Sequence, residues 1–259
     1  MDAATPLTPD TPRHASPPGQ HAPPQGQAPF PPVAGALIDL CGVLYDDSIW
    51  SRWLFKVVQR LGLHTTYTPF FRVWRCEYLS RVKRQELEYW EALRVFLRAA
   101  GLSSGQIDEV EAAGHAQLRK YESQLMPLPG VPHVLTQLHN RGIELALLSS
   151  ACLDTRGVHD RLDALGLSPY FSSVLSIPDL WRQYPEHPAF PIAARSTRLP
   201  CHRLAFVGRD TALLTEAGEA GMCRVAVNYD NDAVADVFLR GFDRLTDDVC
   251  WESVPPPTS

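Results

Sequence analysis

Short apolar runs alternate along the chain with longer stretches in which apolar and polar positions recur at helical spacing. The apolar runs resemble strands buried on both faces of a sheet, and they fall at 36–38, 143–148, 174–177, 203–207 and 224–227. The helical stretches between them fall at 131–141, 156–165, 188–197 and 211–220. Strands that alternate with helices of this length predict an α/β fold, a Rossmann-like parallel sheet with helices on both faces.

Residues 47–126 carry a different pattern, because no segment among them has the character of a strand. Apolar residues three and four positions apart predict helices at 49–61, 70–79, 85–100 and 106–125. Many of these residues are aromatic, and a helical stripe of aromatics is more often core than ligand contact. We therefore expect an all-helical cap inserted into the α/β core, with the core formed by residues 33–46 and 127–250.

The two ends of the chain have the composition of irregular segments. Residues 1–32 hold ten of the 23 prolines, so they bury too little apolar surface to offset their ordering entropy. We expect a disordered proline-rich tail there. The alternative is that the tail is bound by a protein that recognises proline-rich segments. Residues 251–259 are expected to form a flexible C-terminal tail.

Composition and charge narrow the class of protein. The chain has 259 residues, 45% of them hydrophobic, and a net charge of −5, which favours neither a nucleic acid nor a membrane surface as partner. The six cysteines are scattered singly, as expected of reduced thiols that bind no metal. No secretory signal and no apolar run of about 20 residues is found. We expect a cytoplasmic protein whose oligomeric state the sequence leaves open.

The strand at 36–38 ends in Asp39, and Gly42 follows with the freedom for a tight turn. Open α/β sheets bind ligands at the carboxyl ends of their strands, although a lone aspartate there is more often a turn residue. Further segments of the chain favour a functional role for Asp39. They are Leu128-Pro-Gly-Val131, Ala146-Leu-Leu-Ser-Ser-Ala151, Leu165-Gly-Leu-Ser-Pro-Tyr-Phe171, Phe206-Val-Gly208 and Glu219-Ala-Gly-Met222.

In this order, the segments resemble the haloacid dehalogenase superfamily over about residues 36–227. The resemblance implies an aspartate nucleophile that forms an aspartyl-phosphate, and a second aspartate two residues later as general acid and base. It also implies a serine or threonine and a lysine that hold the phosphoryl oxygens, and acidic residues that help to hold Mg²⁺.

The first two motifs match this pattern in part. The resemblance makes Asp39 the nucleophile, Ser149 the phosphate-binding hydroxyl, and Gly42 and Ser150 substrate-binding residues. Cys41 replaces the general acid, and a thiol is a poor substitute because its ordinary pKa is far above that of a carboxylic acid.

The third and fourth motifs depart further. His187 or Arg182 would take the place of the lysine. Alternatively, His187 is a solvated residue of a loop. Arg209 replaces the metal-binding aspartate, and Asp210 is one residue out of register, so we prefer it as a helix cap over a metal ligand beside Asp39. We hypothesise an Arg209–Asp39 ion pair at the metal position.

Three functions are compatible with these residues. The first is a degenerate phosphatase site with weak or lost activity, which serves binding, scaffolding or regulation and needs no cofactor. The second is an active phosphatase that uses Mg²⁺ and acts on a small phosphorylated metabolite. The third is a metal-independent, haloacid-dehalogenase-like hydrolase whose aromatic cap encloses an apolar substrate. We rank them in this order.

Overall fold

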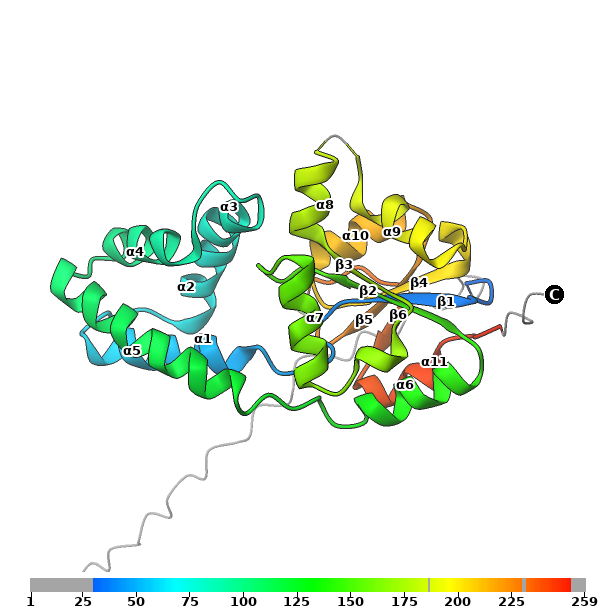
Figure 1. Ribbon diagram of the computed structural model, residues 1–259. Coiled ribbons are helices and arrows are strands. Elements are labelled where there is room, and N and C mark those ends of the chain that lie inside the picture. Colours follow the sequence, from blue (N-terminus) through cyan, green and yellow to red (C-terminus); the bar gives the residue numbers. More distant parts are fainter. Residues whose placement is uncertain (1–29, 186, 230–231, 253–259) are drawn as a thin grey trace, which may run out of the picture.

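A single parallel sheet forms the centre of one lobe of the molecule (Figure 1). The computed structural model describes residues 30–185, 187–229 and 232–252. The strands are β1 (Gly35–Ile38), β2 (Glu144–Ser149), β3 (Ser173–Ser176), β4 (Leu204–Gly208), β5 (Cys223–Val227) and β6 (Val237–Leu239). They are ordered β3-β2-β1-β4-β5-β6, and every neighbouring pair is parallel.

Helices cover both faces of this sheet. One face is covered by α6 (Val131–Asn140), α7 (Thr155–Ala164) and α11 (Leu245–Asp248), and the other by α8 (Ile177–Gln183), α9 (Ala189–Thr197) and α10 (Thr211–Glu219). Successive strand residues point to opposite faces, so Ile38 packs in the first layer and Leu37 in the second. Both are fully buried, which explains why the strands are continuously apolar.

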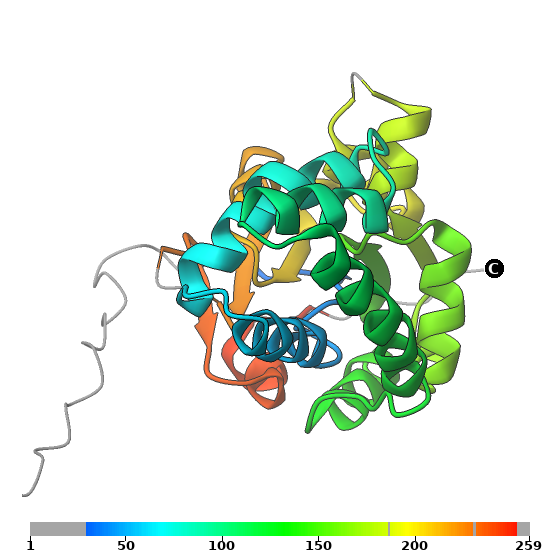
Figure 2. The ribbon, with the colours of Figure 1, turned by 90° about the vertical axis from the view of Figure 1, so that its left-hand side faces the viewer.

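The second lobe is the helical insertion expected between the first two strands. It consists of α1 (Ser48–Arg60), α2 (Tyr67–Val73), a π-helical segment (Trp74–Leu79), α3 (Ser80–Lys83), α4 (Tyr89–Ala99) and α5 (Ser104–Glu122). Its own apolar core includes Leu54, Phe70, Trp74 and Phe96. When the molecule is turned, this cap lies in front of the carboxyl ends of the strands (Figure 2).

The α/β fold and the helical character of the cap are thus confirmed, whereas several boundaries were wrong. The helix expected from residue 85 begins only at Tyr89, because Gln85 has a φ of 59° and Glu86 is held by Arg84 in a turn. The helix at 70–79 is part of a longer one that passes through the π-helical segment. The sequence analysis missed α8, β6 and α11, which are too short to show a period.

The chain ends differ from expectation where they are described. Trp251 forms a parallel bridge with Val33, and its indole donates to the Leu245 carbonyl, so residues 251 and 252 belong to the core rather than to a tail. The tails expected at 1–32 and beyond 252 fall largely on residues 1–29 and 253–259, outside the described residues. All six cysteines are free thiols, and no described helix is long and apolar enough to cross a membrane.

Candidate active site

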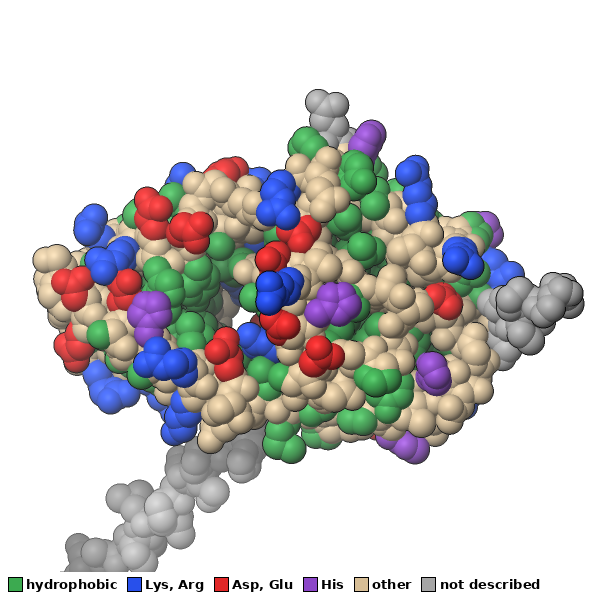
Figure 3. All heavy atoms as spheres, viewed as in Figure 1, with side chains coloured by type: hydrophobic (Ala, Val, Ile, Leu, Met, Phe, Trp, Pro, Cys, Tyr) green, Lys and Arg blue, Asp and Glu red, His purple; other side chains and the backbone are tan. Residues whose placement is uncertain are grey.

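The carboxyl ends of β1, β2 and β4 bring the expected site residues to one edge of the sheet. Asp39 follows β1, Ser149 ends β2, and Arg209 follows β4. The strand order reverses direction beside β1, and a crevice forms at such a switch point in open α/β sheets. The cap faces this edge, and the space-filling view shows an opening between the two lobes with charged side chains around it (Figure 3).

Asp39 is buried and held by hydrogen bonds in a fixed orientation. Only 1% of the residue is exposed. Its Oδ1 accepts from the backbone N–H groups of Leu40 at 2.7 Å and Ser150 at 3.0 Å, while Oδ2 accepts from the Ser150 hydroxyl at 2.8 Å. Burial raises the pKa of this carboxyl, and the bonds from Ser150 and Leu40 oppose that rise.

Ser149, the last residue of β2, and Ser150, which follows it, make different hydrogen bonds. Ser149 has no exposed surface, and its hydroxyl accepts from the Ala151 N–H at 3.2 Å. Ser150 is the residue that contacts Asp39. Of the two hydroxyls that we expected to bind the ligand, one therefore closes the turn after β2 and the other orients the carboxylate.

Cys41, in the position of the general acid, is held as a neutral thiol. Its Sγ lies 3.3 Å from the Tyr45 hydroxyl. Burial, followed by the nearby carboxylates of Asp47 and Asp39, raises the pKa of the thiol to about 12. A group with that pKa releases and recovers protons poorly near neutral pH.

Arg209 forms its ion pair with a residue that the sequence analysis overlooked. Its Nη2 donates to Oδ2 of Asp47 at 2.8 Å, whereas the hypothesised pair with Asp39 stays a prediction. The guanidinium also lies against Gly42, where a Cβ would meet Arg209 Nη1 at 2.5 Å. Gly42 has a φ of 71°, so both its conformation and this contact require glycine. Asp47 immediately precedes α1, and the ion pair therefore joins the end of β4 to the start of the cap.

The donors near this edge do not fit a divalent cation. The Asp210 side chain accepts from the N–H groups of Ala212 and Leu213 and caps α10, as preferred from the sequence. The residue that the resemblance aligns with the metal-binding aspartate, Arg209, carries a guanidinium, which repels a cation instead of binding it. Residues 30–185, 187–229 and 232–252 contain no group of three histidine, cysteine or acidic residues that could hold a metal. We derive no step that involves Mg²⁺.

Neither expected substitute for the third-motif lysine has a described contact with Asp39 or Ser150. Arg182 donates to Asp179 at 2.6 Å, and Asp179 in turn accepts from the backbone and hydroxyl of Thr155. This cluster fixes the start of α7 against α8. His187 is exposed, and its backbone N–H donates to the Tyr184 carbonyl in the turn before α9.

Two cap residues that no motif in the sequence indicated act electrostatically on groups at or near this edge. The charge of Lys83, the last residue of α3, opposes the rise in the pKa of Asp39 and that of Cys152. Tyr89, the first residue of α4, is electrostatically coupled to Cys152 as well. A single basic or aromatic residue at a helix end carries no sequence signal, because its place depends on how the cap sits on the core.

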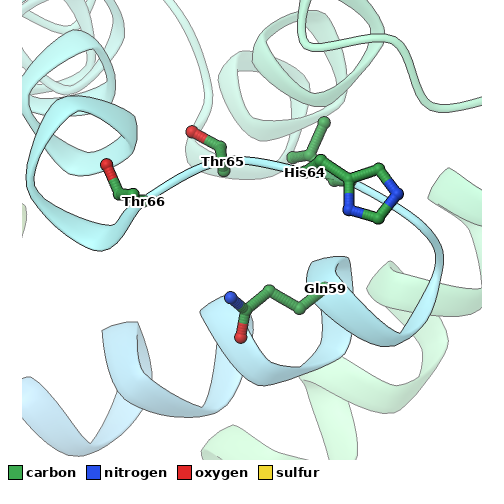
Figure 4. A pocket seen from close by; sticks show the side chains of 5 residues that line it. Gln59, His64, Thr65 and Thr66 are labelled. Carbon is green, nitrogen blue, oxygen red and sulfur yellow. The ribbon is translucent and has the colours of Figure 1, made fainter.

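A separate surface pocket of about 380 Å³ lies within the cap (Figure 4). Its lining comes from the end of α1 and the loop to α2, namely Gln59, Leu63, His64, Thr65 and Thr66. None of the strand-end residues takes part in it. We therefore do not connect this pocket with the chemistry at Asp39.

Comparison with known proteins gives a consistent result. The family model for haloacid dehalogenase-like hydrolases matches residues 33–208. A phosphoglycolate phosphatase from Pseudomonas fluorescens is 27% identical over 136 residues, which cover 51% of this chain and 49% of that protein. The match thus spans about half the length of this relative.

Solved structures show the likeness in three dimensions. A dehalogenase superposes with a TM-score of 0.62 at 18% identity, covering 87% of this chain and 100% of the other. A hydrolase of the same family from Deinococcus radiodurans, solved with bound phosphate and sodium, has a TM-score of 0.59 at 17% identity and covers 83% of this chain and 93% of its own. At such identities the likeness establishes the fold.

Proposed function

The chain belongs to the haloacid dehalogenase-like hydrolase family, and from this membership we propose a binding protein whose phosphatase site has weak or lost activity. Its ligand in this proposal is a small phosphorylated molecule. The observation that carries the proposal is the Arg209–Asp47 ion pair, because the resemblance aligns Arg209 with the metal-binding aspartate of the family's phosphatases.

The remaining residues would support binding better than turnover. The resemblance assigns Asp39 the nucleophile's role, but burial disfavours its ionised form and three hydrogen bonds occupy its oxygens. Cys41 leaves both the leaving group and the attacking water without an efficient proton donor or acceptor. Loss of a general acid or base alone typically costs about 10²- to 10⁴-fold in rate.

An anionic ligand suits the charges around the opening. Arg209 follows β4 of the core and pairs with Asp47 at the start of the cap, and the charge of Lys83 from the cap acts on Asp39 at the end of β1. Cations and backbone N–H groups at a strand–helix turn are the usual elements that bind phosphate. The bound phosphate of the Deinococcus radiodurans structure belongs to that protein and supports the same ligand class here by analogy.

Two catalytic alternatives follow from particular observations. The phosphatase relative favours an active phosphatase acting through an aspartyl-phosphate, although the metal ligands and the third-motif lysine would need substitutes. Likeness to a dehalogenase structure favours attack of Asp39 on carbon without a metal. Lys83 would then serve as the cation beside the nucleophile.

A colorimetric screen for phosphate release from phosphorylated metabolites, with Mg²⁺ present, tests the proposal. We expect rates at background for the wild type and for Asp39→Asn alike. Turnover that Asp39→Asn abolishes would reject the degenerate site. Halide release from 2-haloacids without added metal, also lost in Asp39→Asn, would favour the dehalogenase-like alternative.

A further inference from the structure

The chain passes between core and cap in two connecting segments, and an arginine of the core binds each of them. The first segment leads from β1 to α1 and contains Asp47, and the second follows α5, whose last residue is Glu122. Arg209, directly after β4, donates to Asp47 at 2.8 Å. Arg161, on α7, donates to Glu122 at 3.4 Å. Two ion pairs between the lobes therefore lie where the cap would hinge on the core.

The Arg209–Asp47 pair is better shielded from water than its neighbour. Its side chains are 33% and 26% exposed, against 57% and 40% for Arg52 and Asp46. Asp47 has the N-cap position of α1, yet its side chain caps no backbone N–H there. Its Oδ1 is buried and has no hydrogen-bond partner among the described residues. Separation of the ion pair would leave a shielded carboxylate without its counter-ion, which is unfavourable.

The turn after β1 confines Arg209 on the core side of this pair. The guanidinium lies against Gly42, where a Cβ would meet Nη1 at 2.5 Å. The Gly42 carbonyl accepts from the Asn228 side chain at 2.8 Å, and its N–H donates to the Tyr45 carbonyl at 2.9 Å. The guanidinium is thus bounded by a hydrogen-bonded turn of the core on one side and paired with the first residue before the cap helix α1.

The second connecting segment packs on the same turn. The guanidinium carbon of Arg161 lies 5.6 Å from the centre of the Tyr45 ring, a cation–π contact. The rings of Tyr45 and Tyr121 have their centres 6.5 Å apart, and the Tyr121 hydroxyl donates to the Asp46 carbonyl at 2.7 Å. Arg161 therefore contacts Glu122 at the end of the cap and Tyr45 of the core at once.

We propose that the Arg209–Asp47 ion pair locks the cap in one orientation on the core, with the Arg161–Glu122 pair as a weaker second restraint. The second pair is weaker because it is longer and the Glu122 side chain is 55% exposed. The opening between the lobes then keeps a constant width, and molecules reach the strand ends without movement of the cap. This inference depends neither on the ligand nor on whether the site turns it over.

Distances between spin labels on the two lobes, measured by double electron–electron resonance on the full chain, test the inference. The two exposed cysteines can carry the labels, because Cys76 lies in the π-helical segment of the cap and Cys250 lies in the core. The wild type should give one narrow distance distribution. We expect Arg209→Gln and Asp47→Asn each to broaden it or to add a second distance, because either change removes the ion pair at the hinge.

Two further variants separate the ion pair from general effects. The double variant Arg209→Gln/Asp47→Asn should broaden the distribution no more than either single change, because both changes remove the same contact. Arg94→Gln removes an arginine that pairs with Asp108 and Glu111 inside the cap, so it is the matched control and should leave the distribution narrow. Thermal melts establish that every variant is folded at the temperature of labelling.

Three results would overturn the inference. One is a distribution that stays narrow in folded Arg209→Gln and folded Asp47→Asn. Another is a wild type whose distribution is already broad, because the ion pair would then not hold the cap. The third is equal broadening in Arg94→Gln and Arg209→Gln, which would assign the effect to the loss of a positive charge anywhere in the protein.

Discussion

Arg209 is the residue that separates this site most clearly from a metal-binding one. Its guanidinium is always charged, lies on Gly42 and pairs with Asp47, so a divalent cation would meet repulsion at that position. Asp47 is itself largely buried, and burial raises its pKa while Arg209 opposes the rise. The positive charge of Arg209 therefore stabilises the ionised form of the Asp47 carboxylate.

Replacing this arginine by aspartate should create a cation site. In Arg209→Asp, the new carboxylate joins Asp39 and Asp47, so we expect Mg²⁺ to stabilise the variant and not the wild type. At a Mg²⁺ concentration of 100 times the dissociation constant, the gain is about 2.7 kcal/mol. For a chain of this size that is roughly 5–10 °C in the melting temperature.

The control for this experiment is Arg240→Asp, an equal change of charge at an exposed position of the core. It should melt at the same temperature with and without Mg²⁺. A wild type stabilised by Mg²⁺ as strongly as Arg209→Asp would show that Arg209 does not exclude the metal.

The buried carboxyl of Asp39 predicts a dependence of stability on pH. Its folded-state pKa is raised, so the folded protein loses stability as the pH rises through that value, whereas below the unfolded pKa no penalty exists. In Asp39→Asn, the amide oxygen can still accept from Leu40 and Ser150, and no ionisation occurs. The variant should melt higher than the wild type near neutral pH, by about 3 °C for each unit of raised pKa.

This difference should vanish at a pH below the ordinary aspartate pKa, where both proteins are uncharged at position 39. Asp160→Asn, at an exposed position of α7, should show no such pH-dependent difference. If Asp39→Asn melts lower than the wild type at neutral pH, the ionised carboxylate stabilises the fold and burial is not the dominant effect.

Residues within motifs could be located from the sequence, and their partners could not. Asp39, Ser149 and Arg209 were placed at strand ends because each follows an apolar run directly. The partner of Arg209 could not be found this way, because Asp47 is 162 positions away in the chain. Ser150 is 111 positions from Asp39 in the chain. Its contact with the Asp39 carboxylate likewise could not be predicted, because it depends on how β1 and β2 pair.

At the scale of elements, hydrogen bonds hold the two segments in which the chain passes between core and cap. Asp46 lies in the first of these segments, and its carbonyl accepts from the Tyr121 hydroxyl at 2.7 Å. Tyr121 lies near the end of α5, where the chain returns to the core, so this hydrogen bond joins the two connecting segments. Leu128 and Leu44 add a backbone bond of 2.8 Å beside it.

Tyr121→Phe should weaken this junction. Removal of one hydrogen bond of this kind costs about 1 kcal/mol. Urea unfolding measures the change. Tyr78→Phe removes a cap hydroxyl that makes no hydrogen bond among the described residues, and it should leave the unfolding midpoint unchanged. Equal midpoints for both variants would mean that the bond to Asp46 contributes nothing.

The elements that the sequence predicted correctly are those with a long or strongly apolar period. The strands β1, β2 and β4 are buried on both faces and stand out as apolar runs. The three-residue β6 and the seven-residue α8 are too short to show a period. The late start of α4 depends on the positive φ of Gln85, a conformation that few non-glycine residues adopt and that the helical period does not indicate.

At the scale of the whole molecule, a hydrolase fold presents two lobes, and we propose that they enclose an anion site without the groups needed for turnover. In this proposal Asp39 has the nucleophile's position, and Cys41 and Arg209 replace the groups that would make it react. If Asp39 did attack phosphorus, the absence of an efficient base at position 41 would slow hydrolysis of the aspartyl-phosphate, so the adduct would accumulate.

Intact-mass spectrometry after incubation with acetyl phosphate and Mg²⁺ therefore tests the central claim most directly. The account predicts that the wild type keeps its unmodified mass and is indistinguishable from Asp39→Asn. A phosphoryl adduct on the wild type that Asp39→Asn lacks would contradict it and identify a working nucleophile.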